Sequence, residues 1–496
     1  MDRREFLVGA AASLGSRGLR SNRETKPPVQ HHPNVLILMS DQHKRSCMGA
    51  YGDRVAITPH LDRLAGESVR FTEAYCANPV CTPSRASIMT GLYSHNHEAQ
   101  NNALPYSPHH KTLAHHFGAS GYLTALIGKM HWVDGQTHGF DYRLEFNDWY
   151  QYLGPKTKIY ADELGRPNSG SGLPEIDDLW REEGDPWKGH RDLDNREGSV
   201  AVGRVSLLDE KDHFDNFVAR ESVRFLKEHG TQDQPFFLIT SFLKPHDPFM
   251  PAERFAKMFR PEDMKLPESW GKADIQHLPQ EVRESIRFNG PTPELRDEQE
   301  AKKRIAFYYA NLAQMDDCVG QVIKTLEDLK LDRDTIIVYT SDHGEMLGEL
   351  GLWQKFQFYE GSCGIPLTIR VPGVRPGVCS TPISQVSFSK TITELANVHE
   401  IAPNDGKSFA DLVHDPQSSI QHGPVFAEYA LGTKRAKYLI REGDFKYTFW
   451  THDIPELYNL RTDPEEIHNL ASLSEYAVDV ARLKRRLFEW HKPEEV

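Results

Sequence analysis

The sequence predicts an α/β fold with a largely parallel sheet, followed by a smaller C-terminal α+β domain with an antiparallel sheet. Continuous apolar runs, the amphipathic helical patterns between them and a change of character beyond residue 385 predict this class. The composition is that of a globular protein, 39% hydrophobic and 26% charged. The formal net charge of −13 argues against broad nucleic-acid binding, and no apolar run approaches the length of a membrane span.

Four apolar runs read as strands buried on both faces: residues 34–39, 122–127, 236–242 and 335–339. Each run is followed at once by polar residues. A single Asp after a strand is usually a turn residue, but four such ends indicate a site, because parallel strands present their carboxyl ends at one edge of a sheet. The side chains expected at this edge are Asp41, Gln42, Lys129, His131, His246, Asp342 and His343.

Helical patterns separate the runs. Thr58 is expected to cap a helix that begins at Pro59, and residues 300–329 carry a long amphipathic pattern. A terminal helix is expected over residues 476–490. Together with the strands, these helices favour alternating β and α elements in the larger part of the chain.

The sequence predicts three segments. Residues 1–33 are expected to be an export signal and linker, because Arg3-Arg4-Glu5-Phe6-Leu7 resembles the twin-arginine motif, which implies a periplasmic or secreted protein. Residues 34–385 are the expected catalytic domain. Residues 386–496 are the expected smaller domain, because their apolar segments are short and punctuated by turns.

One cysteine has an unusual setting. The six cysteines show no C-x-x-C spacing, so they indicate neither a disulfide framework nor a zinc array. Cys81 stands at the start of a predicted helix, with Pro83 in the first turn and Gly91 at the end. Free backbone N–H groups and the helix dipole favour an anion there, and Arg85 lies one turn further on the same face.

Taken together, these motifs resemble those of the type I sulfatases. Cys81-Thr82-Pro83-Ser84-Arg85 resembles the C-x-P-x-R signature of that family, and the similarity extends over residues 34–471. The other matching segments are Asp41-Gln42, Gly128-Lys129-Met130-His131, Lys244-Pro245-His246, Ser341-Asp342-His343-Gly344-Glu345, Lys355 and residues 456–471. The resemblance implies an alkaline-phosphatase-like fold.

The resemblance also implies a modified nucleophile. In this family a separate formylglycine-generating enzyme oxidises the cysteine to formylglycine (3-oxoalanine), which implies the same conversion at Cys81. One hydroxyl of the hydrated aldehyde attacks sulfur, and loss of the proton from the other later expels sulfate. Arg85 would hold the anion and the diol.

Further roles follow from the same motifs. Lys129 and Lys355 would bind sulfate oxygens, His131 would act as a base on the diol, and His246 would protonate the leaving alcohol. Asn102 and Lys244 are expected either to face the pocket as substrate-binding residues or to be a turn amide and a solvated lysine.

A divalent cation is the implied cofactor. Its expected ligands are Asp41, Gln42, Asp342, His343 and residue 81 itself. Hard oxygen ligands favour Ca²⁺. Gln42 stands where many sulfatases have Asp, which lowers the charge of the site and admits Mg²⁺ or Mn²⁺ as substitutes.

Two other functions remain open. A phosphonate monoester or phosphodiester hydrolase of the same superfamily can share the Asp-Gln pair, although Lys129 and His131 favour sulfate esters. An inactive sulfatase-like protein could instead bind an anionic glycan. Residues 128–144 are similar to a segment of choline-sulfatase-like members, which implies choline sulfate as a substrate. Sulfated carbohydrates and aryl sulfates remain alternative substrates.

Overall fold

Each of the four apolar runs forms a strand in the computed structural model. They are β1 (Asn34–Asp41), β3 (Leu123–Gly128), β5 (Phe236–Pro245) and β6 (Thr335–Ser341). The structure describes residues 32–102, 107, 109–131, 136–163, 203–288, 296–420 and 422–493. The four strands lie side by side in the order β3-β5-β1-β6, all parallel, so their carboxyl ends share one edge as the sequence predicts.

Five further strands complete this sheet within the described part of the chain. In full the order is β4-β3-β5-β1-β6-β7-β2-β8, and β9 pairs with β2. β7 is antiparallel to both of its neighbours, β6 and β2, so the sheet is mostly but not wholly parallel. The additional strands are β2 (Val69–Tyr75), β4 (Tyr142–Leu144), β7 (Gly364–Arg370), β8 (Gly377–Cys379) and β9 (Ile383–Ser384).

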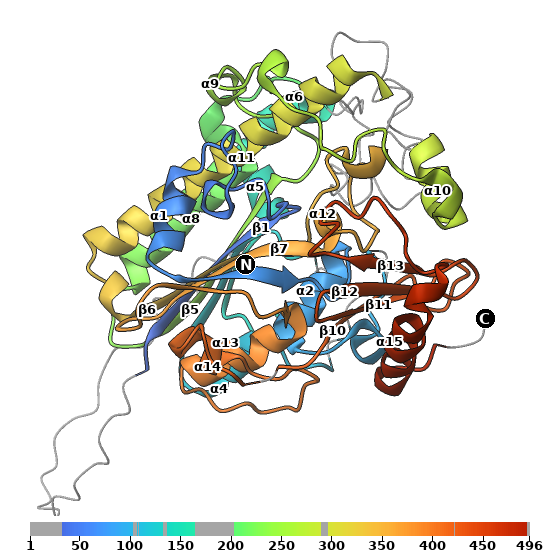
Figure 1. The fold of residues 1–496 in the computed structure, drawn as a ribbon. Helices are drawn as coiled ribbons and strands as arrows, with labels where there is room; N and C mark the ends of the chain where they lie inside the picture. The colour runs from blue at the N-terminus through green and yellow to red at the C-terminus, as the bar shows by residue number, and fades with distance from the viewer. Residues whose placement is uncertain are drawn as a thin grey trace, which may run out of the picture. The chain divides into compact units, whose positions relative to one another are not determined.

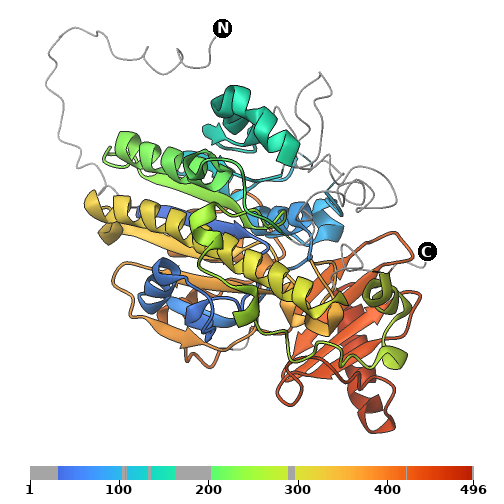
Figure 2. The same cartoon turned by 90° about the horizontal axis from the view of Figure 1, so that it is seen from above.

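Helices cover both faces of the sheet (Figure 1). One face carries α1 (Pro59–Gly66), α8 (Phe214–His229) and α11 (Glu298–Asp328), and α8 lies beside α11 (Figure 2). On the other face lie α2 (Cys81–Thr90), α4 (Leu113–Ala119), α13 (Phe388–Leu395) and α14 (Ala410–His414). The remaining α-helices described are α3 (Ser94–His97), α5 (Phe146–Leu153), α6 (Thr157–Glu163), α9 (Glu253–Ala256), α10 (Gln280–Phe288) and α12 (Glu360–Cys363).

The central strand β1 explains why its sequence is continuously apolar. Leu36 and Leu38 belong to the hydrophobic core beneath α1, α8 and α11. Val35, Ile37 and Met39 belong to the core on the opposite face. Successive side chains of a strand point to opposite faces, so a strand that is covered on both sides needs apolar residues at every position.

A second, antiparallel sheet lies in the C-terminal part. Its strands are β10 (Val425–Tyr429), β11 (Lys437–Glu442), β12 (Phe445–Trp450) and β13 (Glu456–Asn459). Helix α15 (Ala477–Trp490) packs on this sheet through Leu483 and Leu487. The fold class predicted from the sequence is therefore confirmed.

Residues between the two sheets pack with the larger one. Helix α13 contacts both α2 and α4, and Phe388, Ile392 and Phe409 belong to the core of that face. The antiparallel sheet itself begins only at Val425. The division into domains at residue 385 stays a prediction.

Some sequence predictions fall outside the described residues. These include the twin-arginine segment at Arg3 and Arg4 and residues 132–135 of the segment reminiscent of choline-sulfatases.

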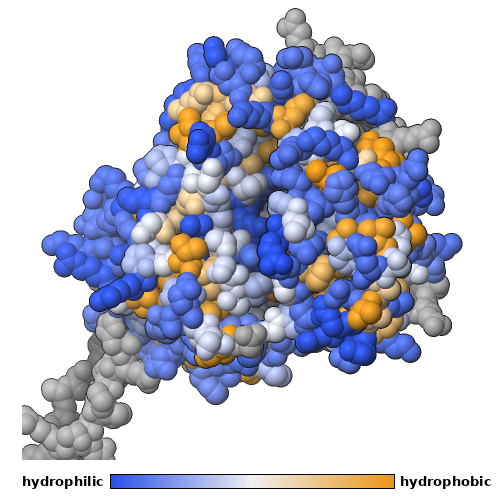
Figure 3. Space-filling model, in the orientation of Figure 1, coloured by the Kyte–Doolittle hydropathy of each residue, from blue (hydrophilic) through white to orange (hydrophobic). Residues whose placement is uncertain are grey.

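Figure 3 shows a largely hydrophilic surface in this view, with hydrophobic residues in small scattered groups. Among the helices that the structure describes, none has the length and apolar character that crossing a membrane requires.

Candidate active site

Helix α2 carries Cys81 at its first position. Val80 precedes it in an extended conformation, and Gly91 ends the helix in the left-handed region (φ 69°), with its N–H bonded to the Ser87 carbonyl at 2.9 Å. The Ser84 hydroxyl donates to the Asp342 carbonyl at 2.5 Å and fixes the first turn against β6. The whole helix is buried, so Cys81 is held rigidly at the carboxyl edge of the sheet.

Side chains from several strand ends surround the Cys81 sulfur. His343 Nε2 lies 3.2 Å from Sγ, and Lys355 Nζ lies 3.4 Å from it. Asp41 Oδ1 is 3.8 Å away and Lys129 Nζ 4.0 Å away. The structure thus brings together residues that are far apart in the sequence, as the strand pattern predicts.

Arg85 joins the two carboxylates of this site. Its Nη2 lies 3.0 Å from Asp41 Oδ2, and its Nε lies 2.8 Å from Asp342 Oδ2. Nη1 donates to the Lys129 carbonyl at 2.5 Å and to Ser241 Oγ at 3.0 Å. The guanidinium is fully buried. These hydrogen bonds make Arg85 a support for the carboxylates, while its expected contact with an anion stays a prediction.

The carboxylate oxygens that Arg85 does not bind lie near the His343 ring, and that of Asp41 also lies near Cys81. His343 Nε2 lies 3.9 Å from Asp41 Oδ1 and 3.8 Å from Asp342 Oδ1. Asp41, Cys81, Asp342 and His343 each offer a ligand atom within 4.8 Å of the others, and all four are buried. Two hard oxygens with an imidazole and residue 81 fit a divalent cation.

The Lys355 ammonium has three acceptors around it. It lies 2.8 Å from Gln42 Oε1, 3.4 Å from Cys81 Sγ and 2.7 Å from His246 Nε2. An ammonium has three N–H groups, so this arrangement uses each of them. His246 Nδ1 lies 2.5 Å from the Asp247 carbonyl and must donate to it, which leaves Nε2 to accept from Lys355.

The Gln42 amide is fixed by groups on both sides. Its oxygen accepts from Lys355, and its Nε2 donates to Glu345 Oε2 at 2.5 Å and to Asp247 Oδ1 at 3.1 Å. Glu345 Oε1 in turn accepts from the backbone N–H of Gln354 at 2.6 Å. Gln42 therefore points its amide oxygen toward the site. A carboxylate in its place would be repelled by Glu345 and Asp247.

The charges at the site favour the anionic form of residue 81. Burial opposes ionisation of the Cys81 thiol, but Lys129 and Lys355, with His343 and a hydrogen bond from His131, hold its pKa well below the usual value. For Asp41, burial and the Cys81 charge oppose ionisation, yet Lys129, His246 and Arg85 outweigh them and lower its pKa. Residue 81 thus lies in a buried pocket where nearby ammonium groups stabilise negative charge.

The backbone around the site departs from ordinary conformations. Four residues that are not glycine lie in the left-handed region: Gln42 (φ 64°), His131 (φ 70°), Gln354 (φ 65°) and Phe356 (φ 79°). Such conformations persist where the surrounding structure enforces them, and they concentrate at functional sites. Gly128 (φ 112°) is needed because a Cβ there would lie 1.8 Å from the Ser241 carbonyl oxygen.

The remaining predicted site residues take different positions. The His131 side chain interacts with the Cys81 thiol, and its carbonyl accepts from the Thr82 hydroxyl at 3.3 Å. Asn102 Oδ1 accepts the Thr82 backbone N–H at 3.0 Å, so it helps to satisfy the start of α2. Lys244 Nζ donates to Asn311 Oδ1 and to the Met250 carbonyl, both at 3.1 Å, which ties it to α11.

Sequence reasoning missed four residues that support the site. Glu345 is the last residue of the quoted motif at 341–345 and Asp247 directly follows Lys244-Pro245-His246, so their positions were a usable signal. Ser241 lies inside the apolar run of β5, one residue before Phe242, and nothing in the sequence distinguishes it. Gln385 Oε1 accepts from the Ser84 hydroxyl at 2.9 Å, and its Nε2 donates to the Asp342 carbonyl at 3.0 Å. These partners lie 301 and 43 residues away in the sequence.

Comparisons with known proteins agree with this geometry. A family model described as Sulfatase matches residues 33–398, and one described as N-sulphoglucosamine sulphohydrolase, C-terminal, matches residues 348–493. A choline-sulfatase of Rhizobium meliloti (strain 1021) is 32% identical over 461 residues, covering 91% of this chain and 85% of the relative. An arylsulfatase of Clostridium perfringens (strain 13 / Type A) is 27% identical, covering 92% and 94%.

Solved structures share the fold. The phosphonate monoester hydrolase of Agrobacterium radiobacter superposes with a TM-score of 0.77 at 23% identity, covering 92% of this chain and 95% of that one. At this identity the likeness supports the architecture alone.

The family match spans well over half of the chain and is joined by a relative above 30% identity. The chain therefore belongs to the sulfatase family of the alkaline-phosphatase-like superfamily and is a sulfuric ester hydrolase.

Proposed function

We propose that the protein hydrolyses a sulfate ester to an alcohol and inorganic sulfate, with residue 81 acting as a formylglycine hydrate beside a divalent cation. One observation carries this proposal: Lys129, Lys355, Asp41 and His343 all lie within 4.0 Å of the Cys81 sulfur. A buried nucleophile position that has both ammonium groups and metal-ligating groups close to it suits a tetrahedral anion.

Asp41, Asp342, His343 and the amide oxygen of Gln42 would hold the cation, together with residue 81. Ca²⁺ is the first candidate because most of these donors are oxygens, and Mg²⁺ or Mn²⁺ are substitutes. When bound, the cation would polarise a sulfate oxygen and favour ionisation of a hydroxyl at residue 81. Arg85 would keep both carboxylates turned toward it, because it occupies their outer oxygens.

Lys129 and Lys355 would neutralise the charge that grows on the sulfate oxygens in the transition state. A hydroxyl of residue 81 forms the new S–O bond while the S–O bond to the alcohol breaks. His246 would supply the proton that the departing alkoxide takes up. His131 would then accept a proton from the second hydroxyl, so that the C–O bond to sulfate breaks and the aldehyde returns. The distances of Lys129 and Lys355 to Cys81, and of His246 to Lys355, support three of these roles, and the effect of His131 on the Cys81 thiol supports the fourth.

The substrate class is proposed from the relatives. Their names include choline-sulfatase, arylsulfatase and N-acetylglucosamine-6-O-sulfatase. The alcohol would lie on the His246 side, because His246 is the proposed acid for the leaving group. Choline sulfate, aryl sulfates and 6-O-sulfated glucosamine form the panel that would identify the alcohol.

One partner protein and a location belong to the proposal. A formylglycine-generating enzyme would modify the C-x-P-x-R segment before folding, because Cys81 is fully buried in the folded protein. Twin-arginine export would then carry the folded enzyme to the periplasm or outside. A fusion of residues 1–33 to a reporter protein should be exported, and retention in the cytoplasm would contradict this part.

Peptide mass spectrometry combined with rate measurement tests the mechanism. Protein produced with the converting enzyme should carry the aldehyde at residue 81, and its sulfatase rate should scale with the converted fraction. The Cys81→Ser variant is matched in size but has no second hydroxyl whose deprotonation could expel sulfate and form an aldehyde, so it should not turn over. A fully active protein with unmodified Cys81 would refute the proposal, and an unmodified, inactive protein that retains sulfated glycans would favour a binding function.

A further inference from the structure

A second group of metal-ligating side chains lies outside the Cys81 site. His95 belongs to α3, Glu428 to β10, and His491 follows the last residue of α15. One ligand atom from each of the three lies within 4.8 Å of the other two. We propose that His95, Glu428 and His491 bind one divalent transition-metal ion, with Zn²⁺ as the best-suited ion.

Glu428 is the centre of this group. Its side chain is 0% exposed, and its oxygens lie 2.8 and 3.0 Å from His95 Nδ1. The backbone N–H of His95 donates to the same carboxylate at 2.7 Å. A buried carboxylate needs a positive partner. Here the partner is either a proton on His95 or a metal ion in its place.

The position of the Glu428 carboxylate favours a cation. It is fully buried, and both of its oxygens lie within 3.0 Å of His95 Nδ1. A divalent cation would gain from the same carboxylate, and its binding would release the proton to solvent.

Aromatic side chains hold the two imidazoles close together. The His95 and His491 rings stack with centroids 4.1 Å apart at an interplanar angle of 24°. Trp490 packs edge-on against His95 at 5.4 Å, and Tyr438 stacks on His491 at 5.7 Å. Tyr438 is also the cross-strand partner of Glu428. Both imidazoles are therefore held beside Glu428, and one ring must turn out of the stack for both nitrogens to face a single ion.

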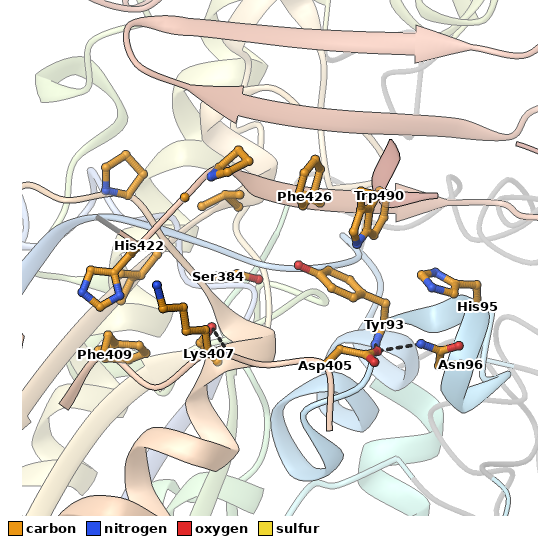
Figure 4. Close-up of a pocket in the computed structure, with 16 residues that line it drawn as sticks. Tyr93, His95, Asn96, Ser384, Asp405, Lys407, Phe409, His422, Phe426 and Trp490 are labelled. Carbon is orange, nitrogen blue, oxygen red and sulfur yellow. Dashed lines mark hydrogen bonds between the residues drawn. The ribbon is translucent and has the colours of Figure 1, made fainter. Parts of the chain in front are cut away.

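The donor set selects the class of metal. Two imidazole nitrogens and one carboxylate suit Zn²⁺, whereas Ca²⁺ prefers oxygen ligands alone. Three protein ligands leave a fourth tetrahedral position for water. His95 also lines a cavity of about 450 Å³, where Tyr93, Trp490, Asn96 and Asp405 lie around it (Figure 4), so solvent can reach this side of the site.

A bound metal ion would link His491 to the segments that flank helix α2, which carries Cys81. The Glu428 N–H donates to the Ala77 carbonyl at 3.0 Å, four residues before Cys81, and α3 begins shortly after α2 ends. The ion would thus connect His491 to segments on both sides of α2. It would stabilise the folded enzyme without taking part in sulfate chemistry, so the inference is independent of the proposed mechanism.

Calorimetric titration of the full-length enzyme with ZnCl₂ tests the site. Excess Ca²⁺ is present to compete at the oxygen-rich cluster of Asp41 and Asp342. The wild type should bind one equivalent of Zn²⁺ that the double variant His95→Gln/His491→Gln lacks. His422→Gln is the matched control: His422 lines the same cavity and pairs with Asp411 at 3.0 Å, yet belongs to no cluster of three ligands among the described residues. This control should still bind one equivalent of Zn²⁺.

Thermal unfolding gives a second readout. Saturating Zn²⁺ should raise the Tm of the wild type and of His422→Gln, because an ion that binds only the folded state stabilises it. The single variant His491→Gln should show no such rise, and it decides the matter if the double variant does not fold. Equal Zn²⁺ binding and equal Tm shifts in the wild type and His491→Gln, or no binding by the wild type, would overturn the inference.

Discussion

Lys355 Nζ lies 2.7 Å from His246 Nε2, and the lysine donates while the imidazole accepts. His246 Nδ1 is meanwhile bound to the Asp247 carbonyl, which fixes the ring and its tautomer. In this arrangement His246 holds no proton on the nitrogen that would face a leaving alcohol. A bound sulfate would draw the Lys355 ammonium toward its own oxygens, and His246 Nε2, once freed, would take up a proton from solvent that it then donates to the leaving alcohol. The acid step therefore depends on Lys355 and His246 together.

His246→Ala should lower kcat in a way that depends on the leaving group. An alkyl sulfate releases a basic alkoxide that needs a proton, so its rate should fall by about 10²–10⁴-fold. A nitrophenyl sulfate releases a stable phenolate and should lose much less. Steady-state rates over a series of aryl and alkyl sulfates measure this. Lys355→Met is the comparison variant and should slow all substrates by about 10²–10³-fold. A uniform loss in His246→Ala would contradict its role as an acid.

Arg85→Ala should destabilise the protein strongly. The guanidinium neutralises Asp41 and Asp342, and all three groups are fully buried. Removing one partner of a buried ion pair costs about 3–5 kcal/mol of unfolding free energy. Arg63→Ala is the control, because Arg63 is 44% exposed and pairs with Glu327 at the surface, where a loss below about 1 kcal/mol is expected. Equal losses for the two variants in denaturant unfolding would be inconsistent with a supporting role for Arg85.

Without metal, the Gln42→Glu variant should have a lower unfolding free energy than the wild type, and added metal should restore part of the difference. The substitution keeps the shape of the side chain but sets a carboxylate against Glu345 and Asp247 in place of an N–H donor. Loss of these buried hydrogen bonds should cost about 1–3 kcal/mol in the chelator-treated protein. Added Ca²⁺ should restore part of this loss, because the variant offers the cation a charged ligand. The exposed Gln321→Glu should change little, and identical stability of Gln42→Glu and wild type in chelator would count against the geometry.

Lys437 should make stability depend on alkaline pH. Its ammonium is fully buried, 2.6 Å from Gln357 Oε1 and 4.2 Å from the Trp450 ring centroid. Burial lowers its pKa to about 8, against the opposing effect of Glu281. The unfolded chain therefore binds more protons between about pH 8 and the ordinary lysine pKa near 10.4. Over this window Lys437 should raise the unfolding free energy with pH, by at most about 1.4 kcal/mol per unit.

The Lys437→Met variant removes this titration. Unfolding by denaturant at several pH values from 7.5 to 10 should show the wild type gaining stability relative to the variant. Below about pH 8 the difference should be constant, because Lys437 is then protonated in both states. Parallel curves over the whole range would show that Lys437 does not titrate as described.

The sequence could predict those parts of the site that lie at strand ends. Asp41, Lys129, His246 and Asp342 follow four apolar runs, and parallel pairing brings such ends to one edge. The β7 strand was missed because its antiparallel pairing with β6 and β2 depends on partners up to about 300 residues away. No local pattern reports such pairing.

The hydrogen-bond partners were the least predictable feature. Arg85 lies on the expected face of α2, yet only the fold shows that Asp41, Asp342 and Ser241 take up its donors. Lys244 stands in a matching motif, but its direction is set by Asn311 on a helix that begins more than fifty residues later. Side-chain direction depends on tertiary packing, which a sequence pattern does not encode.

The central claim is that this site processes sulfate esters rather than phosphate diesters. The most direct measurement is the ratio of kcat/KM for 4-nitrophenyl sulfate to that for bis(4-nitrophenyl) phosphate, with enzyme converted at Cys81 and saturated with Ca²⁺. Lys129 and His131 beside residue 81 predict a ratio well above one. A ratio well below one would contradict the account and assign the site to phosphodiester or phosphonate hydrolysis.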